Sequence, residues 1–216
     1  MLVQLSTLKL RLGIPAYETG EDNLLAGILR LVTARFELEC GRRFARDASA
    51  TFEFDAQEMD LRVDRYPVES VSGFHLKSSE AGGWTEVSDV EHLILPARSI
   101  IRLSQPLGAG GEIGRVTYAG GYVLPGETAG PGQTPLPAEL ELAAAEQAAY
   151  WHQNRNRLGL LSVGGGSGGV PLLQELGLLP GSSPADFKGT AWFKFSGVDL
   201  LPGVASVLRR YERKEW

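Results

Sequence analysis

The residues that could do metal chemistry are few and widely separated. The three histidines, His75, His92 and His152, lie far apart in the sequence, and the single cysteine, Cys40, is close to none of them. Metal centres usually take ligands from closely spaced pairs of such residues. The sequence therefore predicts no metal site and no cofactor, and one cysteine cannot form an internal disulfide.

Two glycine-rich stretches resemble phosphate-binding loops only in composition. The stretch 164–169 is not followed by Lys and Ser or Thr, and no apolar strand precedes it. The stretch 108–114 leads into a strand, whereas a dinucleotide-binding loop leads into a helix. We interpret the first stretch as a linker and the second as a turn.

The serines and carboxylates do not form a recognisable catalytic pattern. Ser79, Ser162 and Ser167 lack the sequence around a nucleophile elbow, and the acidic residues are spread as surface charge. The sequence thus identifies no catalytic residue and favours a protein that is not an enzyme. A β-rich ligand-binding or hydrolytic domain, with a site assembled from distant residues, is the alternative.

The elements that organise the chain are a strand and the long helix after it. Residues 115–122 alternate β-forming side chains and end near paired glycines, and Pro137 suits the first position of a helix. Two apolar stripes follow along this helix, one of Leu140, Ala144, Ala148 and Trp151 and one of Leu142, Ala145 and Ala149. Such a helix must be covered on more than one side.

Two further helices are expected before it. Ser6 can cap a short helix that runs to Leu12 and ends at Gly13. A longer helix, from about Asp22 to Gly41, carries large apolar residues at helical spacing: Leu24, Leu25, Ile28, Leu31, Val32 and Phe36. We expect this helix to pack on the alanine-rich one, because small side chains allow close approach.

The region between these helices is predicted to be β. Short alternating segments occur at 51–54, 59–63, 68–76, 84–87, 92–95 and 100–103, separated by Gly, Pro or Asp. The stretches 82–83 and 108–111 have the composition of hairpin tips. The fold class is therefore α+β: a long-helix pair with short accessory helices and an inserted antiparallel meander or small barrel-like sheet.

Composition divides the chain into three parts and restricts its function. Residues 1–157 can form a body, 158–199 are a Gly/Pro-rich arm with an aromatic cluster at Trp192, Phe193 and Phe195, and 200–216 are a short amphipathic segment. The net charge of -5 disfavours a protein that grips nucleic acid. Neither a leader peptide nor a membrane span is expected.

The order of these motifs resembles the head-tail connector (adaptor) family of long-tailed bacteriophages. The resemblance rests on stretches 8–14, 40–44, 65–68, 116–122 and 136–151, and covers roughly residues 1 to 157. It implies a virion protein at the neck, made in the host cytoplasm. Such a protein forms a ring of about twelve copies between the portal and the next neck or tail-completion protein. DNA would pass through the ring without sequence recognition.

The resemblance also implies that a terminal extension contacts a neighbouring neck protein. The best candidate for docking on the portal is the amphipathic segment, whose candidate residues are Val204, Val207, Leu208, Arg209, Arg210, Tyr211, Arg213 and Trp216. Its apolar residues could fill a partner's groove while its arginines pair at the rim. The alternative is that this helix packs on its own body, with the aromatic cluster as its platform.

Overall fold

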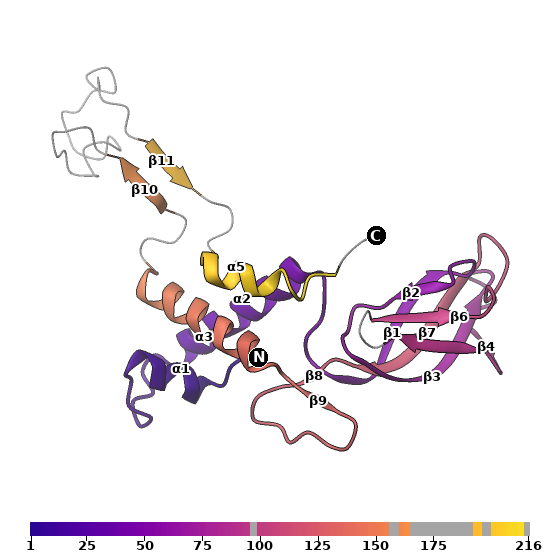
Figure 1. Cartoon of the computed structure of the whole chain (residues 1–216), viewed down its shortest axis with the longest axis horizontal. Coiled ribbons are helices and arrows are strands. Elements are labelled where there is room, and N and C mark those ends of the chain that lie inside the picture. Colours follow the sequence, from indigo (N-terminus) through magenta and orange to yellow (C-terminus); the bar gives the residue numbers. More distant parts are fainter. Residues whose placement is uncertain (96–98, 156–159, 165–191, 196–199, 214–216) are drawn as a thin grey trace.

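The computed structural model describes residues 1–95, 99–155, 160–164, 192–195 and 200–213. Helices gather at one end of the molecule and a β-rich part lies at the other, joined by extended segments (Figure 1). Each end has its own hydrophobic core. This arrangement confirms the α+β class and the insertion of the β region between the two long helices.

The helical end consists of α1 (Leu5–Leu12), α2 (Asp22–Cys40), α3 (Ala138–Gln153) and the short α5 (Pro202–Leu208). As predicted, α2 packs on α3, and α1 and α5 also contact α3. Large side chains of α2 meet small ones of α3 in a single core that includes Leu25, Ile28, Val32, Phe36, Ala144, Ala145 and Ala148. The tight pairing of α2 with α3 thus follows from complementary side-chain size.

The helix ends agree with the sequence patterns in part. Gly13 and Gly41 end α1 and α2 in the left-handed conformation, with φ of 70° and 59°. Ser6 was predicted to cap α1, but this is wrong, because the N-cap is Gln4 and no side chain caps that end. Ser6 lies inside the first turn, where its hydroxyl donates to the Gln4 Oε1 at 3.3 Å.

The β-rich end contains two antiparallel sheets. The first has the order β1 (Asp47–Asp55), β7 (Ile113–Gly120), β3 (Val68–Lys77) and β4 (Thr85–Val87), and the second has β2 (Asp60–Arg62), β6 (Ile100–Leu103) and β5 (His92–Leu95). Both sheets contribute to one core that includes Phe54, Phe74, Val116 and Tyr118 from the first and Leu61, Ile101 and Leu103 from the second. The predicted small barrel-like region is therefore two facing sheets.

The two predicted hairpin tips differ in outcome. Gly83, with φ of 65°, lies in the turn that joins the paired strands β3 and β4. Gly111 has φ of 90°, but it lies between β6 and β7, which belong to different sheets. The second tip is therefore wrong as a hairpin, although the turn does use a glycine at positive φ.

The chain returns from the β-rich end at Gly121. Its φ is 100°, and a Cβ there would lie 2.6 Å from the carbonyl oxygen of Ala45. The next strand, β8 (Tyr122–Val123), pairs in parallel with β9 (Thr134–Pro135), which leads to α3. Gly121 thus lets two backbone segments approach closely at the entrance to the helical end.

The expected arm begins and ends in a two-stranded ribbon. Strands β10 (Leu160–Gly164) and β11 (Trp192–Phe195) pair antiparallel, and Figure 1 shows them extending beyond the helices. Residues 165–191, and hence most of the predicted arm, lie outside the described residues. Among the helices that the structure describes, none has the length and apolarity to cross a membrane.

Candidate assembly surfaces

The C-terminal helix packs on its own chain. The side chains of Val204 and Leu208 are each 1% exposed and belong to the core formed with α2 and α3. The Leu201 amide donates to the Gln147 side chain at 3.0 Å, and the Cys40 thiol lies 3.6 Å from the Leu208 carbonyl. The prediction that these two apolar residues form a free docking face is therefore wrong for the chain alone, because both side chains are already buried.

The remaining candidate docking residues are divided between internal contacts and solvent. Val207 and Tyr211 pack partly against the same core, and the Tyr211 hydroxyl donates to Glu139. Arg210 pairs with the other oxygen of Glu139 at 2.6 Å and stays largely exposed. Arg209 is exposed, and Trp216 lies outside the described residues. Helices α2 and α3 pack against α5, whereas the side chains of the aromatic cluster expected as its platform, at 192–195, lie outside the described residues.

Arg213 connects the helical end to the β-rich end. Its amide donates to the Cys40 carbonyl at 2.8 Å, and its guanidinium donates at 2.5 Å to the carbonyl of Arg62, the last residue of β2. The neighbouring Arg42 donates to the Ser99 hydroxyl at 2.7 Å. Burial, followed by the charge of Arg213, lowers the pKa of Arg42. The two arginines therefore act as internal braces, each with a buried Nε atom that has no hydrogen-bond partner among the described residues.

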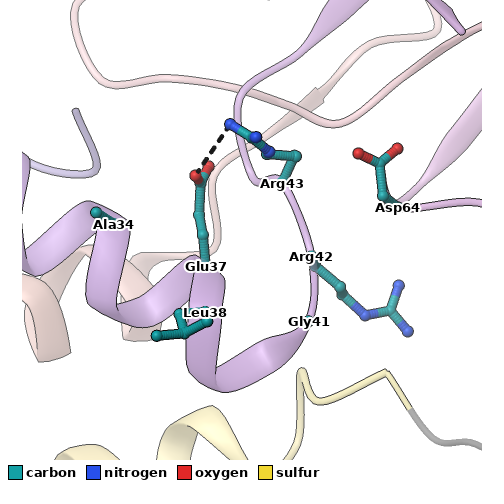
Figure 2. Close-up of a pocket in the computed structure, with 7 residues that line it drawn as sticks. All are labelled: Ala34, Glu37, Leu38, Gly41, Arg42, Arg43 and Asp64. Carbon is teal, nitrogen blue, oxygen red and sulfur yellow. Dashed lines mark ion pairs between the residues drawn. The ribbon is translucent and has the colours of Figure 1, made fainter.

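A surface cavity of about 380 Å³ lies where α2 ends and the chain crosses to the β-rich end. Figure 2 shows Glu37 and Arg43, two residues that line it, pointing toward each other. The Arg43 Nη1 and Glu37 Oε2 atoms are 3.9 Å apart. Glu37 also accepts from the Phe44 amide at 3.1 Å, and Asp64 accepts from the Tyr118 hydroxyl at 2.5 Å. The carboxylates that line this cavity are thus already held by the chain itself.

The potential metal ligands remain separated in space. The His152 Nε2 atom lies 2.8 Å from the Glu21 Oε2 atom. The His92 ring packs edge-on against the Phe74 ring, with 5.4 Å between their centroids. His75 is on β3, with a buried Nδ1 that lacks a partner in the described part of the chain. Burial raises the pKa of the Cys40 thiol to about 12. Within the described ranges, no group of His, Cys, Asp or Glu is placed to hold a metal ion.

The outer face of α2 is an unexpected feature of the surface. Leu24, Leu31 and Leu38 are 44%, 58% and 72% exposed, respectively. Leu24 and Leu31 were predicted to pack on α3 with the other large apolar residues of α2, but this is wrong, because both side chains are exposed. Their spacing repeats every two turns, so these leucines form one stripe along the helix.

The outer face of α3 also differs from the prediction. Leu142 was expected on a buried stripe with Ala145 and Ala149, but it is 52% exposed while both alanines are buried. The other stripe is correct, since Leu140, Ala144, Ala148 and Trp151 are all buried. Beside Leu142, Glu141 is half-buried and has no ion pair among the described residues. The sequence could have indicated both outer faces, since each helix is apolar around too much of its circumference for one partner.

Comparison with known proteins finds solved structures that have a similar fold. No protein-family model matches the chain, and no curated protein matches it in sequence. Among solved structures, the neck of an empty gene transfer agent (GTA) particle computed with C6 symmetry contains a chain with a TM-score of 0.56 and 14% identity. That match covers 100% of this chain and 91% of the other.

Two further solved structures give the same result. The neck of the native GTA particle computed with C12 symmetry matches with a TM-score of 0.54 and 15% identity, over 98% of this chain and 89% of that one. The virion of the native GTA particle matches with a TM-score of 0.53 and 16% identity, over 100% and 91%. The chain therefore has, over nearly its whole length, the fold of a chain found in these particles.

Proposed function

We propose that this protein is a structural component of the neck of a phage-like particle. Many copies form a ring that joins the portal to the next neck or tail-completion protein and surrounds a channel for DNA. The observation that supports this proposal best is the likeness to chains in GTA neck structures, because it extends over both the helical and the β-rich ends. The proposed number of about twelve copies is supported by the C12 symmetry with which one of these necks was computed.

The internal braces suit this role. A subunit that joins two larger bodies would need its two ends to keep a fixed position relative to each other. Arg213 and Arg42 tie the C-terminus and the end of α2 to the β-rich end through hydrogen bonds to Arg62 and Ser99. Each bond has a charged donor, which strengthens it relative to a neutral pair.

The net charge of -5 is consistent with a channel protein. A protein that binds DNA firmly presents clustered Lys and Arg to neutralise phosphates. Most arginines in the described part of the chain form ion pairs within it instead, as do Arg46 with Glu69 at 2.8 Å and Arg115 with Glu53 at 2.6 Å. DNA would therefore slide past such a wall without sequence recognition.

We retain the C-terminal segment as the candidate for portal contact, through a smaller set of residues. Since Val204 and Leu208 are buried internally, the candidate side chains left for a partner among the described residues are the exposed Arg209 and Arg210. Exposed arginines of this kind orient a partner more than they hold it. The portal contact would then require no detachment of α5.

The proposal is tested by adding the purified protein to portal rings from the same particle and measuring mass by light scattering. We expect a complex whose added mass equals about twelve copies. Particles assembled without the protein should be filled heads that lack tails. A protein that never binds portal rings, together with normal tailed particles in its absence, would overturn the proposal.

A further inference from the structure

The outer face of α2 is built like a helix-packing seam that has no partner within the chain. Leu24, Leu31 and Leu38 recur at heptad spacing, and Gly27 and Ala34 occupy the alternate positions between them. The inner face of the same helix is fully used by Leu25, Val32 and Phe36, each buried against the body. A helix that is apolar on both sides is normally covered on both sides.

Gly27 gives independent support for a missing partner. It lies inside α2, where glycine costs about 0.5–1 kcal/mol relative to alanine. A Cβ at this position would meet no atom within 4 Å, so no contact inside the chain requires glycine. A small residue between exposed leucines allows another backbone to approach the helix closely.

The outer face of α3 offers a complementary surface on the opposite side of the helical end. Because α2 and α3 bury their inner faces against each other, their outer faces point in opposite directions, and Figure 1 shows α3 in front of α2. The α3 face has Leu142 exposed and the carboxylate of Glu141 beside it. The α2 face has exposed Arg30 next to Leu31.

The charges on these faces are complementary. Arg30 donates to the Ala26 carbonyl at 3.2 Å but forms no ion pair among the described residues. Glu141 likewise has no ion pair in the described part of the chain. One face therefore has an available positive charge beside a leucine, and the other has an available negative charge beside a leucine. Opposite charges next to apolar contacts set the orientation of two surfaces that associate.

We propose that the outer face of α2 in one copy packs on the outer face of α3 in the next copy. The contact is head-to-tail, so repeated copies can close into a ring. The closing of that ring rests on the proposed function, whereas the pairing of the two faces does not. Contact of two α2 faces about Leu31 is disfavoured, because it would bring the two Arg30 side chains together.

Disulfide trapping distinguishes these arrangements. Leu31→Cys and Leu142→Cys chains are prepared separately, mixed and oxidised at a concentration where the unmodified protein self-associates. We expect the mixture to yield disulfide-linked dimers, each chain alone to yield no linked species, and a chain with both substitutions to yield a ladder of linked multimers. Leu93→Cys, at a position that is 64% exposed on β5, is the control for random collision.

Several results would overturn the inference. If Leu31→Cys alone dimerises as readily as the mixture, the α2 face pairs with itself. If the mixture is trapped no faster than the Leu31→Cys and Leu93→Cys pair, or if the protein never self-associates even on a portal ring, the two faces do not meet. The native Cys40 should not interfere, since its thiol is 1% exposed.

Charge exchange provides a second readout that does not depend on trapping. Arg30→Glu and Glu141→Arg should each weaken self-association by about tenfold, and both changes in one chain should restore it. Variants that still enter the neck normally would refute the proposed faces while leaving the neck function intact. If the unmodified protein is absent from the neck, the proposed function fails, and trapping still decides whether the faces pair.

Discussion

Helices α5 and α2 differ in whether the rest of the chain covers all of their apolar stripes. The short α5 has one apolar stripe, and the structure buries it on α2 and α3. The longer α2 has two, and only one of them is covered. A single stripe on a terminal helix is most simply satisfied within the chain, whereas a second stripe on a helix already packed indicates an external partner.

Removal of the C-terminal segment should have the largest effect. Truncation before Leu200 deletes Val204 and Leu208, two fully buried side chains, and the Arg213 brace. We expect a loss of roughly 4–10 kcal/mol, at about 2–5 for each buried residue, which approaches the whole stability of a typical domain. Thermal melting measures this loss. An unchanged melting temperature would show that α5 contributes nothing to the body.

A single substitution on each helix sharpens the contrast. Leu208→Ala should lower the free energy of unfolding by about 2–5 kcal/mol, because it leaves a cavity in the core. Leu31→Ala should change it by less than about 0.5 kcal/mol, since that side chain is mostly exposed. Denaturant midpoints of dilute protein compare the two. Equal losses would mean that the outer face of α2 is covered within the chain.

These helices also show what the sequence predicts and what it does not. Periodicity and glycine caps located α1, α2 and α3, and alternation located most strands, because local sequence determines these features. Periodicity also showed that α3 is apolar on two sides, but not that the second stripe is covered only at its alanines. That depends on where α1, α2 and α5 lie, so Leu142 was assigned to the core in error.

The candidate site was predicted less well than the fold. The spacing of Val204, Val207, Leu208 and Tyr211 correctly indicated one apolar face, but a docking helix and a helix folded back on its body share that pattern. The hydrogen bond from Arg213 to the Arg62 carbonyl joins distant segments of the chain, so no local sequence pattern predicts it. Leu38 completes the outer stripe of α2 at the spacing of Leu24 and Leu31, so the second face was visible in the sequence and was not separated from the first.

Thiol reactivity compares the inner and outer faces of α2 directly. Cys40 is buried, with its pKa raised from 9.0 to about 12, whereas Leu38→Cys would place a thiol at a position that is 72% exposed. At about pH 8 the new thiol should react at least about tenfold faster than Cys40, because a larger fraction of it is thiolate and its sulfur is accessible to the reagent. A colorimetric thiol reagent should therefore label one group per folded chain. Labelling of both groups at similar rates would contradict this assignment of faces.

The smallest expected effect concerns the polar contacts that hold α5. Glu139→Gln removes the charge that pairs with Arg210 and weakens the contact with the Tyr211 hydroxyl. Because the pair is partly exposed, we expect a loss of about 1 kcal/mol, with α5 still in place. Denaturant unfolding measures it, with Glu127→Gln, in the exposed loop before β9, as a matched control. A loss as large as that from Leu208→Ala would show that polar contacts dominate the docking of α5.

The most direct test of the account is a density map of the particle neck at side-chain resolution. We predict a ring in which Leu31 of each copy contacts the neighbour's α3 near Leu142, while Val204 and Leu208 stay buried in their own chain. Exposed Arg209 and Arg210 should face the portal. A map in which the α2 face meets only solvent, or in which α5 leaves its body to insert into the portal, would contradict the account.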